Sequence, residues 1–238
     1  MNVIVTNFSG NVGKSTVSYH LLLNRLENAQ IIPIESINAD ESEEADKLRG
    51  QQFDELRELM AIYDNAIIDV GASNVESFIS FMKKYKNSHR NFDYFIIPTV
   101  GEEKQIKDTI STIKTLADMG VSPEKIIPVF NKVDDDDDVE KIFSVIFDYY
   151  EDTAAFNLKP NAVIHHTDLF AKLKAVNTTL KDKLTVDDVA NDTNDYNALR
   201  KATQDKMERV ELTRREGLQM LAEAVKDELD SVFNTIMS

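Results

Sequence analysis

The sequence predicts an α/β fold in which helices flank a mostly parallel sheet, followed by a C-terminal helical extension. Three observations predict this class. Short apolar runs alternate with helical patterns up to about residue 176. Several of these runs are apolar at consecutive positions, as in strands that helices cover on both faces. Beyond that point the chain holds one Gly and no Pro, and its apolar residues follow a helical spacing.

Six strands alternate with six helices in the first part of the chain, an order that indicates a parallel sheet with helices on both faces. Gly120, just past one helical pattern, is a suitable C-terminal stop. We expect strands at Val3–Thr6, Ile31–Glu35, Ala66–Val70, Tyr94–Pro98, Ile126–Asn131 and Ala162–His165. We expect helices at Lys14–Glu27, Glu43–Ile62, Val75–Tyr85, Lys104–Met119, Val139–Tyr150 and Asp168–Val176.

The domain boundary is expected at residue 176, with a sheet domain at residues 1–176 and the helical extension at 177–238. The extension carries one apolar helical stripe at steps of three and four residues. Two interpretations of this stripe stay open: the helix docks on the chain's own domain, or it associates with a partner or a second copy. The stripe consists of Leu218, Leu221, Val225, Leu229, Val232 and Ile236.

The composition excludes several classes of function. The chain has 238 residues and no cysteine, which excludes disulfides, thiolate metal sites and cysteine nucleophiles. Its formal net charge of −15 disfavours strong direct binding to nucleic acid or anionic membranes, because both need clustered Lys and Arg. No secretory signal is visible, and no apolar run approaches the roughly 20 residues of a membrane span. We therefore expect a soluble cytoplasmic protein.

The segment FSGNVGKST at residues 8–16 lies between the first strand and the first helix, where parallel sheets bind phosphates. Small residues let backbone N–H groups point inward, Lys14 can reach the β- and γ-phosphates, and Ser15 can ligate Mg²⁺. Phe8 stands where the pattern G-x-x-x-x-G-K-[ST] has its first Gly, and an ordinary turn is the alternative. We assign phosphate binding to Ser9, Gly10, Asn11, Val12, Gly13, Lys14, Ser15 and Thr16.

A second candidate segment, DVGASN, closes the third expected strand. The carboxylate of Asp69 can hold Mg²⁺ directly or through water, and the Gly71 N–H can meet a γ-phosphate. The alternative is a structural role at the start of the next helix, where Ser73 or Asn74 could act as the cap. We assign Asp69 and Ser15 to a magnesium site.

The segment NKVD at residues 131–134 is a candidate base-binding loop. It matches the Asn-Lys-x-Asp pattern in which GTPases use the Asp to bind guanine. Asp134 also opens a run of five Asp residues, which is typical of a solvated loop. The adjacent His165 and His166 point to opposite faces of a strand and make a poor chelating pair. We assign base binding to Asn131, Lys132, Asp134 and His165.

These motifs together resemble those of the ParA/MinD ATPases. The segment FSGNVGKST resembles their GKGGVGKTT loop, NAIIDVGAS their third strand and switch, and PVFNKVD their Asn-containing base loop. The resemblance covers about residues 1–176. Within this group, NFSGNVGKST, ESINADE, DVGASNVE and VFNKV look most like the StbB plasmid-stability proteins.

The resemblance implies a P-loop nucleoside triphosphatase with Mg²⁺ and ATP as cofactors, GTP being the less favoured nucleotide. It implies a slow ATPase switch in plasmid stability, positioning or conjugative transfer, a homodimer, and a DNA-binding partner protein. It also implies a carboxylate beyond the second strand that positions the attacking water, for which Asp40 is the nearest candidate beside Lys14 and Asp69. A signature Lys of this group reaches across the dimer; its place here is taken by Ser9, so that cation is missing.

Two other functions fit the same fold. One is a nucleotide-dependent ligase or kinase acting on a small molecule, which would need a second pocket with convergent basic groups. The other is a P-loop scaffold that binds nucleotide tightly and hydrolyses little, which Phe8 and Ser9 favour. Stimulation of turnover by a small molecule would indicate the first, and nucleotide retention without turnover the second.

Overall fold

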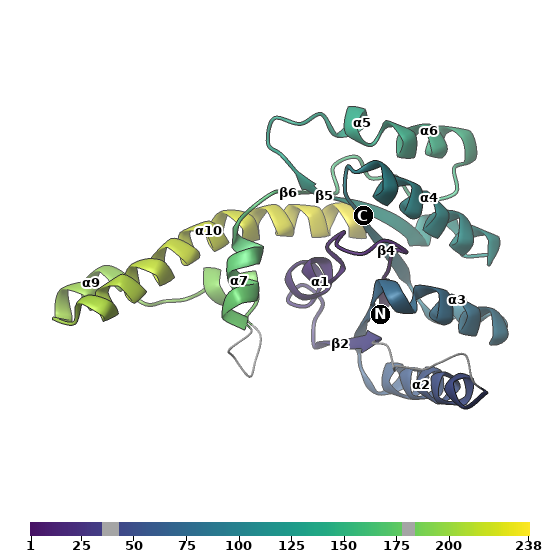
Figure 1. Ribbon diagram of the computed structural model, residues 1–238, viewed down its shortest axis with the longest axis horizontal. Coiled ribbons are helices and arrows are strands. Elements are labelled where there is room, and N and C mark those ends of the chain that lie inside the picture. Colours follow the sequence, from purple (N-terminus) through teal and green to yellow (C-terminus); the bar gives the residue numbers. More distant parts are fainter. Residues whose placement is uncertain (35–42, 178–183) are drawn as a thin grey trace. The chain divides into compact units, whose positions relative to one another are not determined.

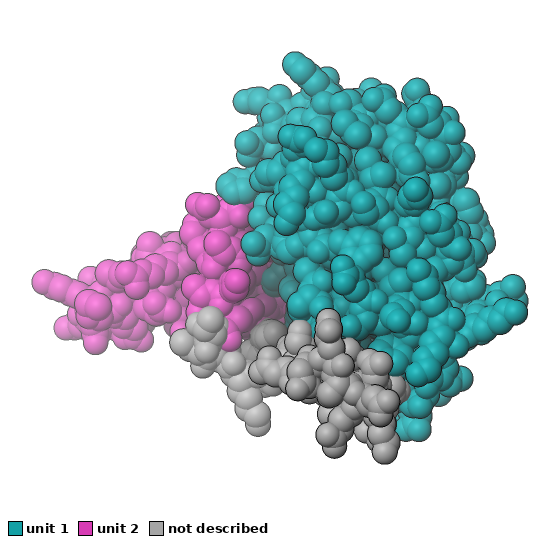
Figure 2. All heavy atoms as spheres, turned by 45° about the vertical axis from the view of Figure 1, so that its right-hand side comes forward, with its two compact units in different colours: residues 1–166, 232–238 teal, residues 167–231 magenta. Residues whose placement is uncertain are grey.

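The computed structural model describes residues 1–34, 43–177 and 184–238. The chain divides into two compact units, shown in different colours in Figure 2. The first unit comprises Met1–His166 together with Val232–Ser238, and the second comprises Thr167–Ser231.

The first unit is built on one six-stranded sheet with the strand order β2-β3-β1-β4-β5-β6 (Figure 1). Every pair of neighbouring strands is parallel, which confirms the predicted sheet. The strands are β1 (Asn2–Val5), β2 (Ala29–Ile34), β3 (Asn65–Val70), β4 (Tyr94–Thr99), β5 (Ile126–Val133) and β6 (Val163–His165).

Helices connect the strands, as the alternation of patterns predicted. Short 3₁₀ turns at Ala72–Asn74, Ser88–Asn91 and Pro123–Lys125 complete the connections. The helices of this unit are α1 (Lys14–Thr16), the π-helical η1 (Val17–Leu22), α2 (Glu43–Ile62), α3 (Val75–Lys84), α4 (Glu103–Asp118), α5 (Val139–Ile142) and α6 (Ser144–Thr153).

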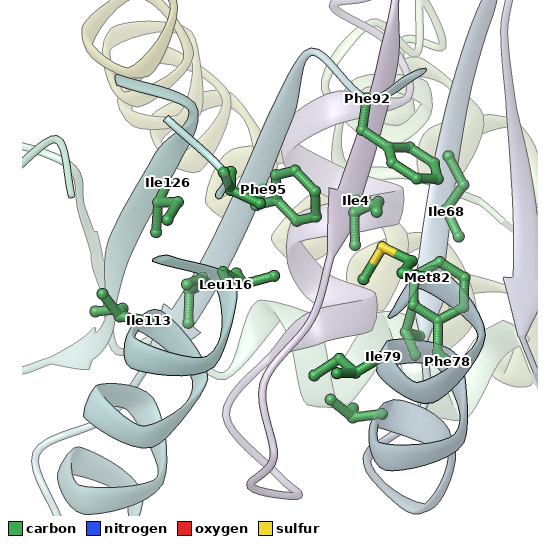
Figure 3. Packing of buried hydrophobic residues seen from close by; sticks show 14 of the residues in the cluster. Ile4, Ile68, Phe78, Ile79, Met82, Phe92, Phe95, Ile113, Leu116 and Ile126 are labelled. Carbon is green, nitrogen blue, oxygen red and sulfur yellow. The ribbon is translucent and has the colours of Figure 1, made fainter. Parts of the chain in front are cut away.

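One face of the sheet packs against α3 and α4. Figure 3 shows side chains of the central strands, such as Ile4 and Phe95, beside Met82 of α3 and Leu116 of α4. All four side chains are buried. Because side chains alternate along a strand, the residues next to Ile4 point to the opposite face, and they are buried as well. Burial on both faces explains the consecutive apolar runs in the sequence.

Two of the predicted helices differ from the structure. The helix expected at Lys14–Glu27 ends at Leu22, and most of it is π-helical, with the Leu23 N–H bonded to the Ser18 carbonyl at 3.2 Å. The apolar pattern in the sequence does not distinguish an α-helix from a π-helix here, because residues four apart, such as the buried Val17 and Leu21, lie on one face in both. The helix expected at Val139–Tyr150 is broken between α5 and α6, where Phe143 is fully packed in the core.

The second unit is helical. It contains α7 (Leu169–Asn177), α8 (Val186–Ala190), α9 (Tyr196–Ala202) and most of α10 (Lys206–Met237). An ion pair between Arg200 and Glu216 links α9 to α10. Among the residues described, no helix combines the length and apolar character that a membrane crossing requires.

The predicted apolar stripe of the C-terminal helix is buried along part of its length. Leu229, Val232 and Ile236 are buried, whereas Leu221 is 38% exposed. The last residues of α10 belong to the first unit, in which Lys159 Nζ donates to Ser238 Oγ at 3.3 Å. The end of the helix is therefore part of the sheet domain.

Candidate phosphate-binding site

The loop that follows β1 lies at the point where the strand order reverses. From β1 the chain crosses to β2 on one side of the sheet, and from β4 it crosses to β5 on the other. Parallel α/β sheets bind ligands at this point, beyond the carboxyl ends of the strands. The topology thus places residues 6–13 where a ligand is expected.

Left-handed backbone conformations shape this loop. Gly13 has φ 95° and Asn11 has φ 59°. A Cβ atom at Gly13 would lie 1.9 Å from Asn131 Nδ2, so the position needs Gly for its space as well as its conformation. At Gly10, by contrast, a Cβ would meet nothing within 4 Å. The chain turns directly into α1 after Gly13, whose carbonyl accepts from the Val17 N–H at 2.9 Å.

The Lys14 ammonium lies buried inside this loop. Nζ donates to the Ser9 carbonyl at 2.6 Å and to the Asn7 carbonyl at 3.3 Å. Burial lowers the pKa of Lys14, and the Asp69 carboxylate partly offsets this effect by raising it. A cation at the start of a helix favours an anionic ligand.

Asp69 and Gly71 lie at the end of the neighbouring strand β3, where Asp69 is level with Val5 of β1. The Gly71 N–H donates to the Ile34 carbonyl at 3.3 Å, and Asn74 Nδ2 donates to the same oxygen at 3.0 Å. In this conformation the end of β2 thus occupies the N–H that we expect to meet a γ-phosphate. Its phosphate role remains a prediction.

The oxygen donors present suit magnesium. Mg²⁺ is usually held by one or two protein oxygens together with substrate phosphates and water. Ser15 is exposed at the first turn of α1, and the Asp69 carboxylate is half-buried near Lys14. Within the described parts of the chain no group of three or more His, Cys, Asp or Glu side chains is arranged to hold a metal. The role of Ser15 and Asp69 in holding Mg²⁺ remains a prediction.

Two of the predicted base-binding residues contact the loop at residues 6–16, the candidate phosphate loop. Asn131 is 3% exposed, and its Nδ2 donates to the Val12 carbonyl at 2.9 Å. Lys132 Nζ donates to the Asn11 carbonyl at 3.2 Å. Both side chains come from the end of β5 and support the second half of the loop. Their contact with a base remains a prediction.

Of the other two predicted base-binding residues, Asp134 directly follows β5 and His165 is the last residue of β6. His165 is level with Val133 in the sheet. The Asp134 side chain is 75% exposed, and its Oδ1 lies 3.9 Å from His166 Nδ1. The predicted catalytic residue Asp40 lies outside the described residues.

Of the residues that hold the first half of the loop, Ser9 is among the predicted site residues, whereas Asn7, Thr109 and Thr112 are not. Asn7 and Ser9 make side-chain hydrogen bonds to α4, and the Phe8 N–H donates to Thr112 Oγ1. The sequence signal for Asn7 is its position as a polar residue directly after the expected strand Val3–Thr6, where functional side chains gather in parallel sheets. Thr109 and Thr112 give no signal of their own, because Thr is common on exposed helix faces.

The sheet order, the loop with its left-handed Gly13 and the buried Lys14 together define an α/β fold of the P-loop class. No family model and no curated protein sequence matches the chain.

Three solved structures illustrate what the chain is similar to. Apo McdA from Cyanothece is 14% identical, with 75% of this chain and 90% of that chain covered and a TM-score of 0.49. A plasmid partition protein from Borrelia burgdorferi B31, bound to AMPPNP, is 14% identical over 77% of this chain and 92% of that chain, with a TM-score of 0.48. ParA of pNOB8 is 11% identical over 97% of this chain and 98% of that chain, also with a TM-score of 0.48.

Proposed function

We propose that this chain binds a nucleoside triphosphate with Mg²⁺ in the loop at residues 9–16. The observation that carries the proposal is the buried ammonium of Lys14, which is the first residue of α1 and is held by the Ser9 and Asn7 carbonyls. The two carbonyl acceptors satisfy N–H donors of the ammonium but bring no opposite charge, so the buried cation still favours an anion beside it. A triphosphate supplies that anion, and its remaining oxygens suit the N–H groups of the loop.

We assign ATP as the nucleotide, with GTP as the less favoured choice. Asp134, which would have to bind the guanine edge, is largely exposed and opens a run of five acidic residues. We assign base binding to Asn131 and Lys132 at the end of β5, together with His165 on the adjacent strand β6. Asp69 and Ser15 would hold Mg²⁺, and Asp40 would position the attacking water.

The biological role that we propose is a slow ATPase switch in plasmid stability, positioning or conjugative transfer. The motif resemblance to ParA/MinD ATPases, and most of all to StbB proteins, supports this role. A DNA-binding partner protein would make the contact with DNA, since the chain carries a net charge of −15. We also propose that the protein forms a homodimer and acts in the cytoplasm.

One contact favours slow hydrolysis. Ser9 stands at the position of the signature Lys, and its Oγ donates to Asp108 Oδ2 at 2.7 Å. A short side chain bonded to a carboxylate of its own chain therefore stands where the resemblance has a Lys that reaches across the dimer. Without that cation, charge that develops on the transferred phosphoryl group is stabilised less.

Equilibrium titration of the protein with ATP and with GTP, each with Mg²⁺, tests the proposal. We expect ATP to bind more tightly than GTP, and Asp134→Ala to leave ATP affinity unchanged within about two-fold. GTP preference that Asp134→Ala abolishes would overturn the assignment of the base. Absence of binding by both nucleotides would overturn the proposed function itself.

A further inference from the structure

Helix α4 is hydrogen-bonded to three consecutive residues of the phosphate loop. Asn7 Nδ2 donates to Thr109 Oγ1 at 2.8 Å, and the Phe8 N–H donates to Thr112 Oγ1 at 3.1 Å. Ser9 Oγ donates to Asp108 Oδ2 at 2.7 Å. The three α4 residues lie at positions i, i+1 and i+4 of one helix, so they share the face turned towards the loop.

Asn7 is the centre of these contacts. It is fully buried, and every hydrogen-bonding group of its amide has a partner. Besides its bond to Thr109, Nδ2 donates to the Pro98 carbonyl at 2.9 Å, and Oδ1 accepts from the Ser9 N–H at 2.8 Å. One side chain thus joins the loop to the end of β4 and to α4.

The same residues hold the Lys14 ammonium. Its two carbonyl acceptors belong to Asn7 and Ser9, which are also the two residues that the Asn7 amide ties together. On the helix side, Thr109 Oγ1 lies 2.9 Å from Thr99 Oγ1 and 2.8 Å from the Gln105 carbonyl. The position of Lys14 is therefore set by a buried network that reaches from the loop into α4.

We propose that Asn7 and Thr109 are positioning residues of the nucleotide site, which place Lys14 through the carbonyls of Asn7 and Ser9. The inference rests on the proposed function, because the placement of Lys14 matters only if this loop binds phosphates. Neither residue touches the nucleotide by this account. Both act through Lys14, and α4 is the element whose position they transmit to the loop.

The replacement Thr109→Val removes one hydroxyl and keeps the shape of the side chain. Asn7 then loses one acceptor in a buried site, and an N–H left without a partner is costly enough to displace the Asn7 amide. We expect the affinity for Mg²⁺-ATP, or for Mg²⁺-GTP if the wild type prefers it, to fall by on the order of ten-fold. Thr109→Ser keeps the hydroxyl, so its affinity should stay within about two-fold of the wild type.

Thr115→Val is the matched control on the same helix. Thr115 Oγ1 donates to the Ser111 carbonyl at 2.8 Å, the same bond along the helix that Thr109 makes to Gln105, and it has no described bond to the loop. Its replacement should leave nucleotide affinity unchanged. Thermal unfolding of all three variants shows whether any loss of affinity follows from a loss of stability.

Amide hydrogen exchange in the nucleotide-free protein provides a second measurement. In the wild type the Ser9 N–H is held by Asn7 Oδ1. We expect exchange in residues 7–14 to speed up in Thr109→Val, and to match the wild type in Thr109→Ser and Thr115→Val.

The outcomes separate the two claims. Loss of affinity and faster loop exchange in Thr109→Val, both restored by Thr109→Ser, would support the positioning role. Wild-type affinity in Thr109→Val would overturn it, as would an equal loss in Thr109→Ser accompanied by a lower melting temperature. A wild-type protein that binds no nucleotide overturns the proposed function, and slow loop exchange in Thr109→Val would then reject the network as well.

Discussion

At the scale of single residues, the conformation of Gly13 is the feature that the loop depends on most. Its φ of 95° is costly for any residue with a Cβ atom, and the nearest atom to such a Cβ would be Asn131 Nδ2. That amide supports the loop through the Val12 carbonyl. A side chain at Gly13 would therefore strain the backbone and displace the support at once.

We predict that Gly13→Ala lowers the free energy of unfolding by about 1–3 kcal/mol and weakens nucleotide binding more than about ten-fold. Gly10→Ala is the matched control, because a Cβ at Gly10 meets nothing within 4 Å. Its stability should stay within about 0.5 kcal/mol of the wild type. Urea unfolding and nucleotide titration measure both effects; equal losses in the two variants would contradict the geometry.

A second prediction concerns the ionisation of Lys14. Burial lowers its pKa below the ordinary value of 10.5. The charged form is therefore disfavoured in the folded state, and this destabilisation is fully present below the folded pKa. It disappears as the pH rises from the folded pKa to 10.5, because the unfolded chain then loses its proton as well.

The comparison of wild type with Lys14→Met, without nucleotide, isolates this effect. We predict that the wild type gains stability relative to Lys14→Met as the pH rises from about 7 towards 10.5. The free energy of unfolding in urea, measured for both proteins across this range, gives the difference directly. A difference independent of pH would show that the pKa of Lys14 is the same in both states.

At the scale of helices and strands, the sequence predicts the sheet well and the first helix poorly. The strands are evident because buried strands such as β3 are apolar at consecutive positions. The π-helical winding of η1 is not evident, because an α-helix would bury the same apolar residues. The end of α4 follows the expectation: Gly120 has φ 86°, and its N–H donates to the Ala117 carbonyl at 2.9 Å.

The candidate site also has a part that could be predicted from the sequence and a part that could not. The loop at residues 8–16 could be predicted because its residue types are tied to phosphate chemistry at fixed spacing. The network of Asn7, Thr109 and Thr112 could not, because it depends on the distance between two segments about a hundred residues apart in the sequence. A single sequence carries no signal for such a distance.

Two glycines, one inside a helix and one just past a helix end, give predictions of opposite sign. Gly217 lies within α10 and is exposed, and a Cβ added there would meet nothing within 4 Å, so Gly217→Ala should stabilise the protein by about 0.5–1 kcal/mol. Gly120→Ala should destabilise it by about 1 kcal/mol, because the position is left-handed. Thermal unfolding of both variants checks the signs, and a destabilised Gly217→Ala protein would contradict the helix at that position.

At the scale of the whole molecule, charge governs which partners the protein can bind directly. The formal net charge is −15, and a field of this sign repels the phosphates of DNA at long range. The proposed phosphate site should escape this repulsion, because Lys14 lies inside the loop as the first residue of α1. We therefore expect anion binding at this loop.

We predict that the purified protein alone does not bind a DNA duplex, with or without Mg²⁺-ATP, even at a low salt concentration of about 50 mM. Fluorescence anisotropy of a labelled duplex measures this directly. Binding in the nanomolar to micromolar range that weakens steeply with added salt would show a basic surface that the net charge conceals, and would remove the need for a DNA-binding partner.

The central claim is that Lys14 binds the phosphates of a nucleotide, and one comparison tests it most directly. The affinity for Mg²⁺-ATP is measured by calorimetry for the wild type, Lys14→Ala and Lys86→Ala, the last being an exposed lysine outside the site. We predict that Lys86→Ala binds like the wild type and that Lys14→Ala loses affinity by at least about a hundred-fold, as expected for a buried charge-assisted contact. Equal affinity in all three proteins would contradict the account.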